Sequence, residues 1–312
     1  EGSSWYHLAS DGSMDTGWLS EGSYWYYLDP ANGGRMATGV RVVDGVTYYF
    51  DLDGRSRPGL DRASLLSAVD SASGSKNTSV VNGTLSQSTI DRLDADLATI
   101  RTGGHEVGYL MIDLTTASVV SANASGNFYC ASTIKGPYVC AAASGWPSKA
   151  VNWKSTMYDA ISWSSNDAYR QLRSAFGSGV MSEFMNEADV SYFYPSTMWP
   201  DIRPRDLSKL WVRTYDYFRS TDANSDWVQD YFFHTKNSFI DAALGGSHHV
   251  YSKAGWIWES SRYYVYNDAA IVDDGWHPYV MVILSTANSS SSSALQTLAT
   301  DLEAAHNELL SL

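Results

Sequence analysis

A serine and a lysine three residues apart, Ser132 and Lys135, are the residues whose types and spacing could perform nucleophilic chemistry. Positions i and i+3 share a face of a helix, so the lysine amine would lie beside the serine hydroxyl. A base that accepts the hydroxyl proton activates this weak nucleophile, and a helix N-terminus favours the resulting anion. The same spacing also arises by chance, as a helix cap followed by a surface lysine.

The flanking sequence predicts a strand-to-helix junction at this pair. Residues 106–120 are rich in β-branched and aromatic types, which predicts a strand, a turn and a second strand. Residues 136–143 are apolar and alanine-rich, which suits a short buried helix. We therefore expect Ser132 and Lys135 at the first turn of that helix.

Two further motifs follow in order. Ser164-Ser-Asn166 begins 32 positions after Ser132, and Lys253-Ala-Gly255 begins 87 positions after Asn166. The three motifs resemble the Ser-x-x-Lys, Ser-x-Asn and Lys-Thr-Gly set of penicillin-binding proteins and serine β-lactamases, class A included. The resemblance runs from about residue 86 to the C-terminus, with further strands expected at 251–258, 262–272 and 278–285. It implies an α+β fold of the β-lactamase/transpeptidase type, with an antiparallel sheet flanked by helices and a reduced helical subdomain.

The resemblance also implies a serine acyl-enzyme mechanism. Ser132 would attack a carbonyl, and Lys135 would accept its proton, helped by burial and by the nearby charge of Lys253, which both lower the lysine pKa. Ser164 would relay a proton to the leaving amine. Asn166 would bind a substrate carbonyl and help to hold Lys135.

The third motif would complete the substrate site. Lys253 would attract the substrate carboxylate, and Gly255 would let a peptide lie against the strand edge. The backbone N–H groups of Ser132 and Trp256 would hold the oxyanion. In a non-catalytic reading, Ser164 and Asn166 would cap the helix that follows, and Lys253 would be a surface charge on a strand.

The chain departs from the family pattern at two places. Ala254 replaces the hydroxyl residue of the third motif, and a lost hydrogen bond to a charged group costs roughly 1.5–3 kcal/mol. The loop at 190–203 contains Asp201 but lacks the glutamate with which class A β-lactamases deacylate. We therefore do not expect an efficient β-lactamase, although Asp201 could stand in for the glutamate.

Residues 1–60 form a repeat array. Aromatic stretches starting at Trp5, Trp25 and Thr47 lie 20 and 22 residues apart, and each is followed by a glycine turn, which predicts stacked β-hairpins. The array resembles the choline-binding and glucan-binding repeats of Gram-positive surface proteins. That resemblance implies an aromatic cage for a quaternary ammonium or a sugar, with Trp18, Trp25 and Tyr48 as candidates. These rings could equally be packing residues.

The expected organisation is a repeat module at 1–60, a linker at 61–85, in which residues 61–72 could form a short helix, and a β-lactamase-like serine hydrolase domain at 86–312. Within the last, residues 86–100 and 292–312 show helical periodicity, which predicts two helices that pack together on the sheet.

Composition excludes several classes. A net charge of −13 argues against nucleic acid as a partner. No apolar run could span a bilayer. Cys130 and Cys140 are too far apart along the expected helix for a disulfide and are predicted to be buried thiols. No metal-ligand spacing is present, so neither a metal nor a cofactor is expected, and three histidines are interpreted as structural or exposed: His234, His248 and His249.

Taken with the resemblance, these features predict a secreted enzyme held at a Gram-positive cell wall. The repeats would bind peptidoglycan, teichoic acid or another wall glycan, and the cleft would take a peptide or a β-lactam. The expected activity is that of a D,D-carboxypeptidase or D,D-endopeptidase on peptidoglycan stem peptides. The alternatives are a β-lactamase or a related acyl hydrolase, and a surface protein that keeps the fold only for binding.

Overall fold

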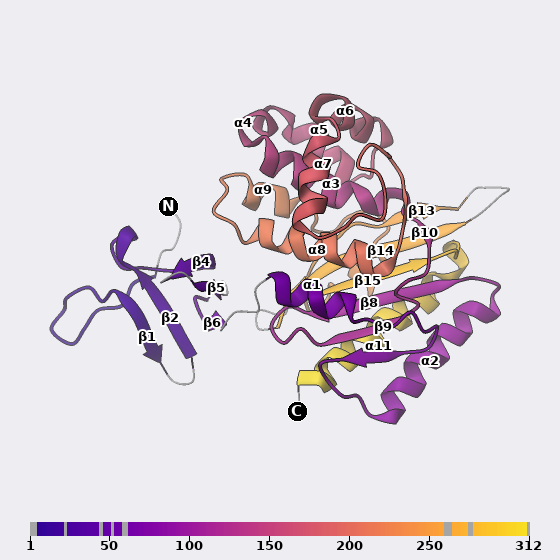
Figure 1. Cartoon of the computed structure of the whole chain (residues 1–312), viewed down its shortest axis with the longest axis horizontal. Helices are drawn as coiled ribbons and strands as arrows, with labels where there is room; N and C mark the ends of the chain where they lie inside the picture. The colour runs from indigo at the N-terminus through magenta and orange to yellow at the C-terminus, as the bar shows by residue number, and fades with distance from the viewer. Residues whose placement is uncertain are drawn as a thin grey trace. The chain divides into compact units, whose positions relative to one another are not determined.

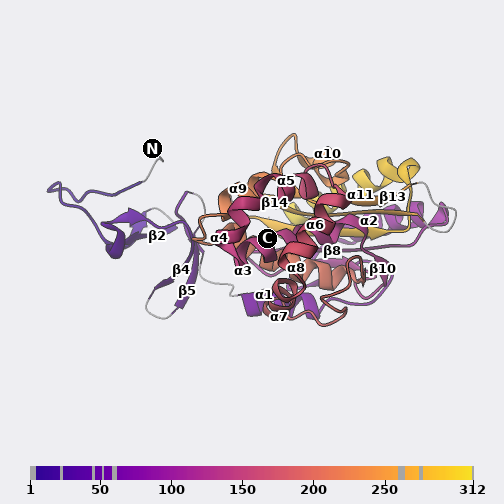
Figure 2. The same cartoon turned by 90° about the horizontal axis from the view of Figure 1, so that it is seen from above.

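The computed structural model describes residues 5–21, 24–43, 46–50, 53–57, 62–258, 264–273 and 277–310. The chain divides into two compact units, one formed by residues 1–61 with 219–221 and the other by residues 62–218 and 222–312. Figures 1 and 2 show the elements of both units.

The smaller unit consists of short antiparallel hairpins, as the repeats predict. One three-stranded sheet contains β1 (Gly17–Glu21), β2 (Tyr24–Asp29) and β3 (Arg35–Met36), and a second contains β4 (Gly39–Val43), β5 (Val46–Phe50) and β6 (Ser56–Arg57). A 3-10 helix at Pro30–Asn32 connects β2 to β3 and ends at Gly33, whose φ of 65° a side chain would disfavour. The hairpin prediction for this region is confirmed.

The larger unit is organised around a seven-stranded antiparallel sheet in the order β12-β14-β15-β8-β9-β7, with β13 paired beside β14 (Figure 1). Its central strands β8, β14 and β15 are buried along their whole length, because helices cover both faces. The strands are β7 (Ser79–Val81), β8 (Val107–Asp113), β9 (Val119–Ala122), β12 (His249–Ser252), β13 (Gly255–Ile257), β14 (Val265–Asp273) and β15 (Tyr279–Ser285).

Alternate residues of these strands meet different helices. On one face, Tyr109, Met111 and Met281 pack in one core with α2 (Gln87–Thr102), α10 (Phe239–Leu244) and α11 (Ser292–Leu310). Helix α8 (Pro204–Phe218) packs against β8, β14 and β15, and α1 (Arg62–Asp70) packs against α8. The predicted contact between the helix near residue 86 and the C-terminal helix is confirmed, because α2 packs along α11.

The helical subdomain lies between β9 and β12 in the chain. Its central helix is α3 (Lys135–Gly145), which is buried from Lys135 to Ala143 and is contacted on several sides by other helices. A helix that is apolar on all sides must be enclosed in this way. The remaining elements are β10 (Phe128–Tyr129), α4 (Pro147–Ala150), a 3-10 helix at Val151–Trp153, α5 (Lys154–Ile161), α6 (Asn166–Phe176), α7 (Gly179–Glu187), β11 (Asp201–Ile202) and α9 (Ser225–Asp230).

The prediction of a linker at 61–85 is wrong for the residues that the structure describes. Helix α1 occupies Arg62–Asp70, and Ser79–Val81 forms the edge strand β7, paired with β9. The Ser/Gly/Asn-rich composition that suggested a linker belongs to the turns around β7. The segment belongs to the larger unit because α1 packs against α8 and β7 forms backbone hydrogen bonds with β9. A polar segment can form such an edge strand, since backbone pairing does not require apolar side chains.

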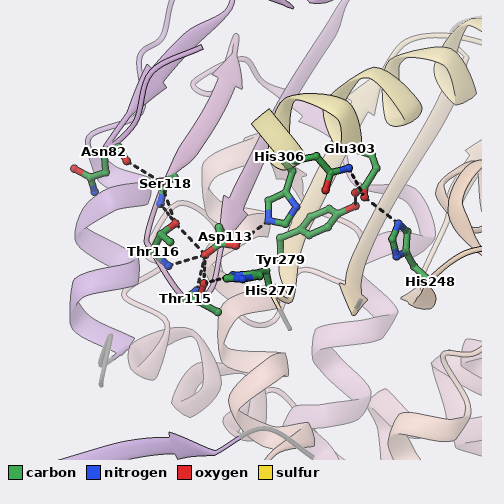
Figure 3. Close-up of polar contacts among 11 residues, drawn as sticks. Asn82, Asp113, Thr115, Thr116, Ser118, His248, His277, Tyr279, Glu303 and His306 are labelled. Carbon is green, nitrogen blue, oxygen red and sulfur yellow. Dashed lines mark hydrogen bonds and ion pairs between the residues drawn. The ribbon is translucent and has the colours of Figure 1, made fainter. Parts of the chain in front are cut away.

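A buried polar network ties α11 to the sheet (Figure 3). The Asp113 carboxylate lies 2.8 Å from His306 Nε2, and both side chains are almost fully buried. The other carboxylate oxygen of Asp113 accepts hydrogen bonds from the backbone and hydroxyl groups of Thr115 and Thr116. Each oxygen of this buried carboxylate therefore has a partner, which is the condition for burying a carboxylate at low cost.

In the described part of the chain, no helix is long and apolar enough to cross a membrane.

Candidate active site

The candidate nucleophile Ser132 lies at a junction between strand β10 and helix α3, as predicted, but in a short 3-10 helix that precedes α3 rather than in the first turn of α3. A 3-10 helix at Ala131–Ile134 leads directly into α3 at Lys135. Ala131 adopts a φ of 46°, a conformation that costs a non-glycine residue about 1–2 kcal/mol. Ser132 is half-buried, and within the described residues its Oγ makes no hydrogen bond. The hydroxyl is therefore available to a base and to a ligand.

Lys135 is buried and directs its amine toward the second motif. Its Nζ donates to the Ser164 carbonyl oxygen at 2.7 Å and to Asn166 Oδ1 at 2.7 Å. Burial, together with a smaller contribution from the positive charge of Arg170, lowers the pKa of Lys135 to about 7. A neutral amine has two hydrogens and one lone pair. Because both partners can only accept, they use the two hydrogens and leave the lone pair to accept a proton.

Ser164 and Asn166 do not cap helix α6. Ser165 is the N-cap, and its Oγ accepts from the Ala168 backbone N–H at 3.1 Å. Ser164 itself has a φ of 60°, which is a strained conformation for serine. The strain turns the Ser164 carbonyl toward Lys135 and its hydroxyl toward Lys253, so the reading of these residues as a simple helix cap is wrong.

Lys253 is fully buried rather than a charge on the surface of a strand. Its Nζ donates to Ser164 Oγ at 3.0 Å and to the carbonyl oxygen of Ala254 at 2.7 Å. Burial lowers its pKa well below the usual range, and the charge of Lys135 acts in the same direction. Ser164 thus connects the two lysines, through its carbonyl to Lys135 and through its hydroxyl to Lys253.

Gly255 has a different reason to be glycine from the one expected. A Cβ built at Gly255 would lie 2.6 Å from Ser132 N, 2.8 Å from Thr133 N and 2.9 Å from the Cys130 carbonyl oxygen. The absent side chain therefore makes room for the backbone of the nucleophile turn, whereas we expected room for a peptide. The same close approach brings β13, which contains Trp256, next to the backbone N–H of Ser132.

Trp256 follows as the second residue of β13 and pairs with Tyr266 of β14. Its ring is half-buried, lies 5.7 Å from Lys253 Nζ, and packs against Trp258 with 5.9 Å between centroids. The expected oxyanion site would use the backbone N–H of this residue, and its ring lies beside Lys253.

Two polar residues of β14 lie next to the candidate site and were not predicted from the sequence. Asn267 Nδ2 donates to the Tyr129 carbonyl oxygen at 2.8 Å, and its Oδ1 accepts from Ser285 N at 2.8 Å, so it ties the nucleophile turn to the sheet. The fully buried Asp268 accepts from Ser238 Oγ and from the Ile240 N–H. The sequence did contain an indication of their role, because Asn and Asp are adjacent inside a strand that is otherwise mostly apolar.

Burial raises the pKa of Asp268 to about 7, while the charge of Lys253 opposes that rise. Asp268 in turn raises the pKa of Lys253. Asp268 is therefore a buried carboxyl group coupled electrostatically to the lysine pair, although the described structure has no ion pair between them.

The loop at 190–203 supplies no carboxylate contact to the candidate site in the described structure. Asp201 is exposed in β11, and its carboxylate accepts from Asn127 Nδ2 at 3.1 Å. The loop instead packs through its backbone: the Met198 carbonyl oxygen accepts from Tyr169 OH at 3.1 Å.

Both cysteines are free and buried, as predicted, and burial raises the pKa of each thiol. Among the described residues no three His, Cys, Asp or Glu side chains could together hold a metal ion.

The predicted cage residues of the smaller unit gather around Trp18. Its ring centroid lies 4.6 Å from that of Tyr48 and 6.4 Å from that of Trp25, in edge-to-face contacts. Trp18 and Tyr48 are half-buried, whereas Trp25 is exposed. A separate cavity of about 380 Å³ in the same unit is lined by other side chains: Trp5, Tyr6, His7, Leu19, Glu21, Tyr26, Leu28, Met36 and Asp53. Sequence reasoning missed this cavity, although Trp5 and Tyr26 belong to the aromatic starts of the repeats.

Comparisons with known proteins agree with this geometry. A family model for the choline-binding repeat matches residues 2–38, and one for the beta-lactamase enzyme family matches residues 144–305. The second match includes Ser164, Asn166 and Lys253 and begins after Lys135. No curated protein matches the sequence.

Solved structures show the same fold. PBP-A is 17% identical with a TM-score of 0.57, covering 70% of this chain and 97% of that one. A class A β-lactamase from Mycobacterium abscessus is 15% identical with a TM-score of 0.57, covering 69% and 99%. A variant of the reconstructed class A β-lactamase of the last common ancestor of Gram-negative bacteria is 16% identical with a TM-score of 0.56, covering 70% and 98%.

The fold, the buried lysine pair around Ser164 and a family match over more than half of the chain lead to one assignment. The chain belongs to the beta-lactamase enzyme family, and it shares its fold with PBP-A.

Proposed function

We propose that Ser132 is the nucleophile of a serine acyl hydrolase that acts on peptidoglycan stem peptides, as a D,D-carboxypeptidase or D,D-endopeptidase. The observation that carries this proposal is the setting of Lys135. Its amine is buried, has a pKa of about 7, and in the neutral form donates both hydrogens, one to Ser164 O and one to Asn166 Oδ1. A base poised near neutral pH is what proton transfer from a serine requires.

In the proposed mechanism, Lys135 accepts the Ser132 proton as Oγ attacks the scissile carbonyl carbon. The backbone N–H groups of Ser132 and Trp256 stabilise the developing oxyanion. Ser164, held by Lys253 at 3.0 Å, passes its hydroxyl proton to the leaving amine as the C–N bond breaks. The proton that Lys135 took from Ser132 then passes to Ser164 Oγ, so that both groups return to their starting state. Water then hydrolyses the ester at Ser132.

We assign Lys253 a part in the proton relay in addition to the attraction of a substrate carboxylate. Because it is fully buried and bonded to Ser164 Oγ, it is placed to poise the proton relay of Ser164. When protonated, Lys253 would also attract a substrate carboxylate.

The missing glutamate leads us to expect slow release of a β-lactam acyl group, and this favours peptidase chemistry over β-lactamase chemistry. The loop at 190–203 has no glutamate, and Asp201 is exposed and engaged with Asn127. A point mutant of PBP-A, which shares the fold, was solved as an acyl-enzyme complex with penicillin G. A β-lactamase with another water-activating group is the second candidate, supported by the class A enzymes of the same fold.

The smaller unit is proposed to hold the enzyme at the cell wall of a Gram-positive bacterium, outside the cell. Its cavity combines aromatic rings with the carboxylates Glu21 and Asp53, a setting that favours a quaternary ammonium such as choline. A wall glycan is the alternative ligand.

Intact-mass analysis after incubation with penicillin G tests the acyl-enzyme proposal. The parent chain should gain the mass of one penicillin molecule, and Ser132→Ala should gain nothing. An intact antibiotic and an unmodified protein would contradict the proposal and favour a non-catalytic binding protein. Rapid hydrolysis without a lasting adduct would favour the β-lactamase alternative.

A further inference from the structure

A large aromatic side chain is held in solvent directly beside the proposed proton relay. Trp163, the residue before Ser164, is 60% exposed. A single exposed tryptophan is common on protein surfaces, but this one is unusual because of its backbone.

Hydrogen bonds hold the chain on both sides of Trp163. Ser162 N donates to the Tyr158 carbonyl oxygen at 2.8 Å, and Ser162 Oγ donates to the Tyr231 carbonyl oxygen at 2.9 Å. On the other side, the Ser164 carbonyl accepts from Lys135, and Ser165 N donates to the Asp159 carbonyl oxygen at 2.9 Å. The exposure of Trp163 is therefore a property of a fixed turn.

Three further aromatic rings lie on α5 and α9 and at the end of α9, and the hydrogen bond of Ser162 to Tyr231 joins these helices next to Trp163. Two of them, Trp227 and Tyr231, are half-buried. The Tyr158 ring, 40% exposed, lies 5.3 Å from the Tyr231 ring, which lies 5.5 Å from the Trp227 ring. We call Tyr158, Trp163, Trp227 and Tyr231 the aromatic strip. Exposed aromatic surface gathered next to a catalytic group marks a ligand-binding area more often than a packing accident.

We infer that the aromatic strip binds the carbohydrate portion of a glycan-linked peptide substrate, so that the enzyme prefers peptides still attached to sugar. The inference rests on the proposed function for the identity of the reaction, but sugar binding by the strip can be tested without turnover.

The chemistry of the strip selects a sugar over more peptide. An extended peptide needs backbone donors and acceptors along its length, which a strand edge supplies and aromatic rings do not. A pyranose ring offers an apolar C–H face that packs on an aromatic face, while its hydroxyl groups remain in water. The amphipathic Tyr and Trp side chains suit a ligand of that kind. Because Trp163 is covalently next to Ser164, a sugar on the strip would stay close to the reacting peptide.

Titration calorimetry with a β-1,4-linked tetramer of N-acetylglucosamine tests the strip, using the full-length Ser132→Ala chain to prevent turnover. Trp163→Ala in that background should weaken binding by roughly tenfold, the equivalent of about 1.4 kcal/mol. Trp146→Ala is the matched control, because Trp146 is also exposed, at 55%, but lies at the end of α3. Equal affinity in the Trp163 variant and its parent, an equal loss in the control, or no binding at millimolar tetramer would each overturn the inference.

A second measurement compares kcat/KM for a disaccharide-linked stem peptide and for the free peptide of the same sequence. The parent should favour the linked substrate by about tenfold, and Trp163→Ala should bring the ratio close to one. A parent ratio of one would overturn the preference. If neither substrate is cleaved, the proposed function fails while the tetramer titration still decides the inference.

Discussion

Two buried polar centres of the larger unit differ in whether an ionisable group has an oppositely charged partner. At the network of Asp113 and His306, a carboxylate and an imidazole lie 2.8 Å apart and four hydrogen bonds from Thr115 and Thr116 complete the shell. At the site of Lys135 and Lys253, within the described residues, neither amine lies within ion-pair distance of a carboxylate; both donate to neutral oxygens.

The pKa shifts follow from this difference. Burial alone would raise the pKa of Asp113, but hydrogen bonds from His306 and Thr115 outweigh it and lower the pKa to about 2. Burial lowers the pKa of Lys135 to about 7 with no anion to restore it. A buried carboxylate with an imidazole beside it and four hydrogen bonds keeps its charge, whereas a buried amine bonded only to neutral oxygens remains a proton acceptor near neutral pH.

The largest expected effect is on the rate of acylation. Lys135→Met should slow acylation by penicillin by on the order of 10³-fold or more, because no base remains for Ser132. The free energy of unfolding should change by less than about 1 kcal/mol, since two lost hydrogen bonds are offset by removal of a poorly solvated amine. Stopped-flow acylation and urea unfolding measure the two quantities. A stable variant that acylates at the parental rate would remove Lys135 from the mechanism.

At the centre of Asp113 and His306, a substitution should lower stability and leave the rate of acylation unchanged. His306→Ala should cost about 3 kcal/mol of unfolding free energy, because Asp113 would stay buried without its partner. Acylation of the folded variant should keep the parental rate, because the network lies between α11 and the sheet, outside the contacts of Ser132. Urea unfolding gives the stability. A loss of acylation equal to that in Lys135→Met would show that the centres are not separate.

The pH dependence of stability sharpens the comparison. Because the Asp113 pKa of about 2 is depressed below the ordinary value, the carboxylate contributes stability above about pH 4, and this is lost as pH falls through 2. Relative to Asp113→Asn, the parent should therefore lose about 2 kcal/mol between about pH 5 and pH 2. Urea unfolding across this range gives the difference. A constant gap between the two proteins would mean that Asp113 has an ordinary pKa.

The smallest effect concerns the altered third motif. Ala254→Ser returns a hydroxyl donor to a centre that has few donors for an anionic ligand. Acylation by penicillin at low concentration should become about tenfold faster. A factor of ten corresponds to about 1.4 kcal/mol, which is near the lower end of the range for a hydrogen bond to a charged group. Unchanged kinetics in a folded variant would show that the hydroxyl does not reach the ligand, since Ala254 is fully buried.

Much of this arrangement was predictable because it depends on local sequence. The Ser132 turn, the strands at β8, β14 and β15, and the helices at residues 86 and 292 follow from short-range pattern, and the order of three motifs indicated that Ser132, Ser164 and Lys253 converge.

The remainder depends on contacts between distant segments. Ser165, rather than its neighbours, caps α6, and Gly255 makes room for the backbone at Ser132 rather than for a ligand. The pairing of β7 with β9 gives structure to a stretch with linker-like composition. Asn267 contacts Tyr129, 138 positions earlier in the chain, and no local pattern reports such a contact.

The most direct test of the account is the pH profile of Ser132 acylation by penicillin, measured from about pH 5 to pH 10 on the full chain. A neutral Lys135 base predicts a rate that rises with pH through an apparent pKa near 7 and then levels off. A rate that keeps rising toward about pH 10, as an ordinary lysine would give, or one that is flat across the range, would contradict it.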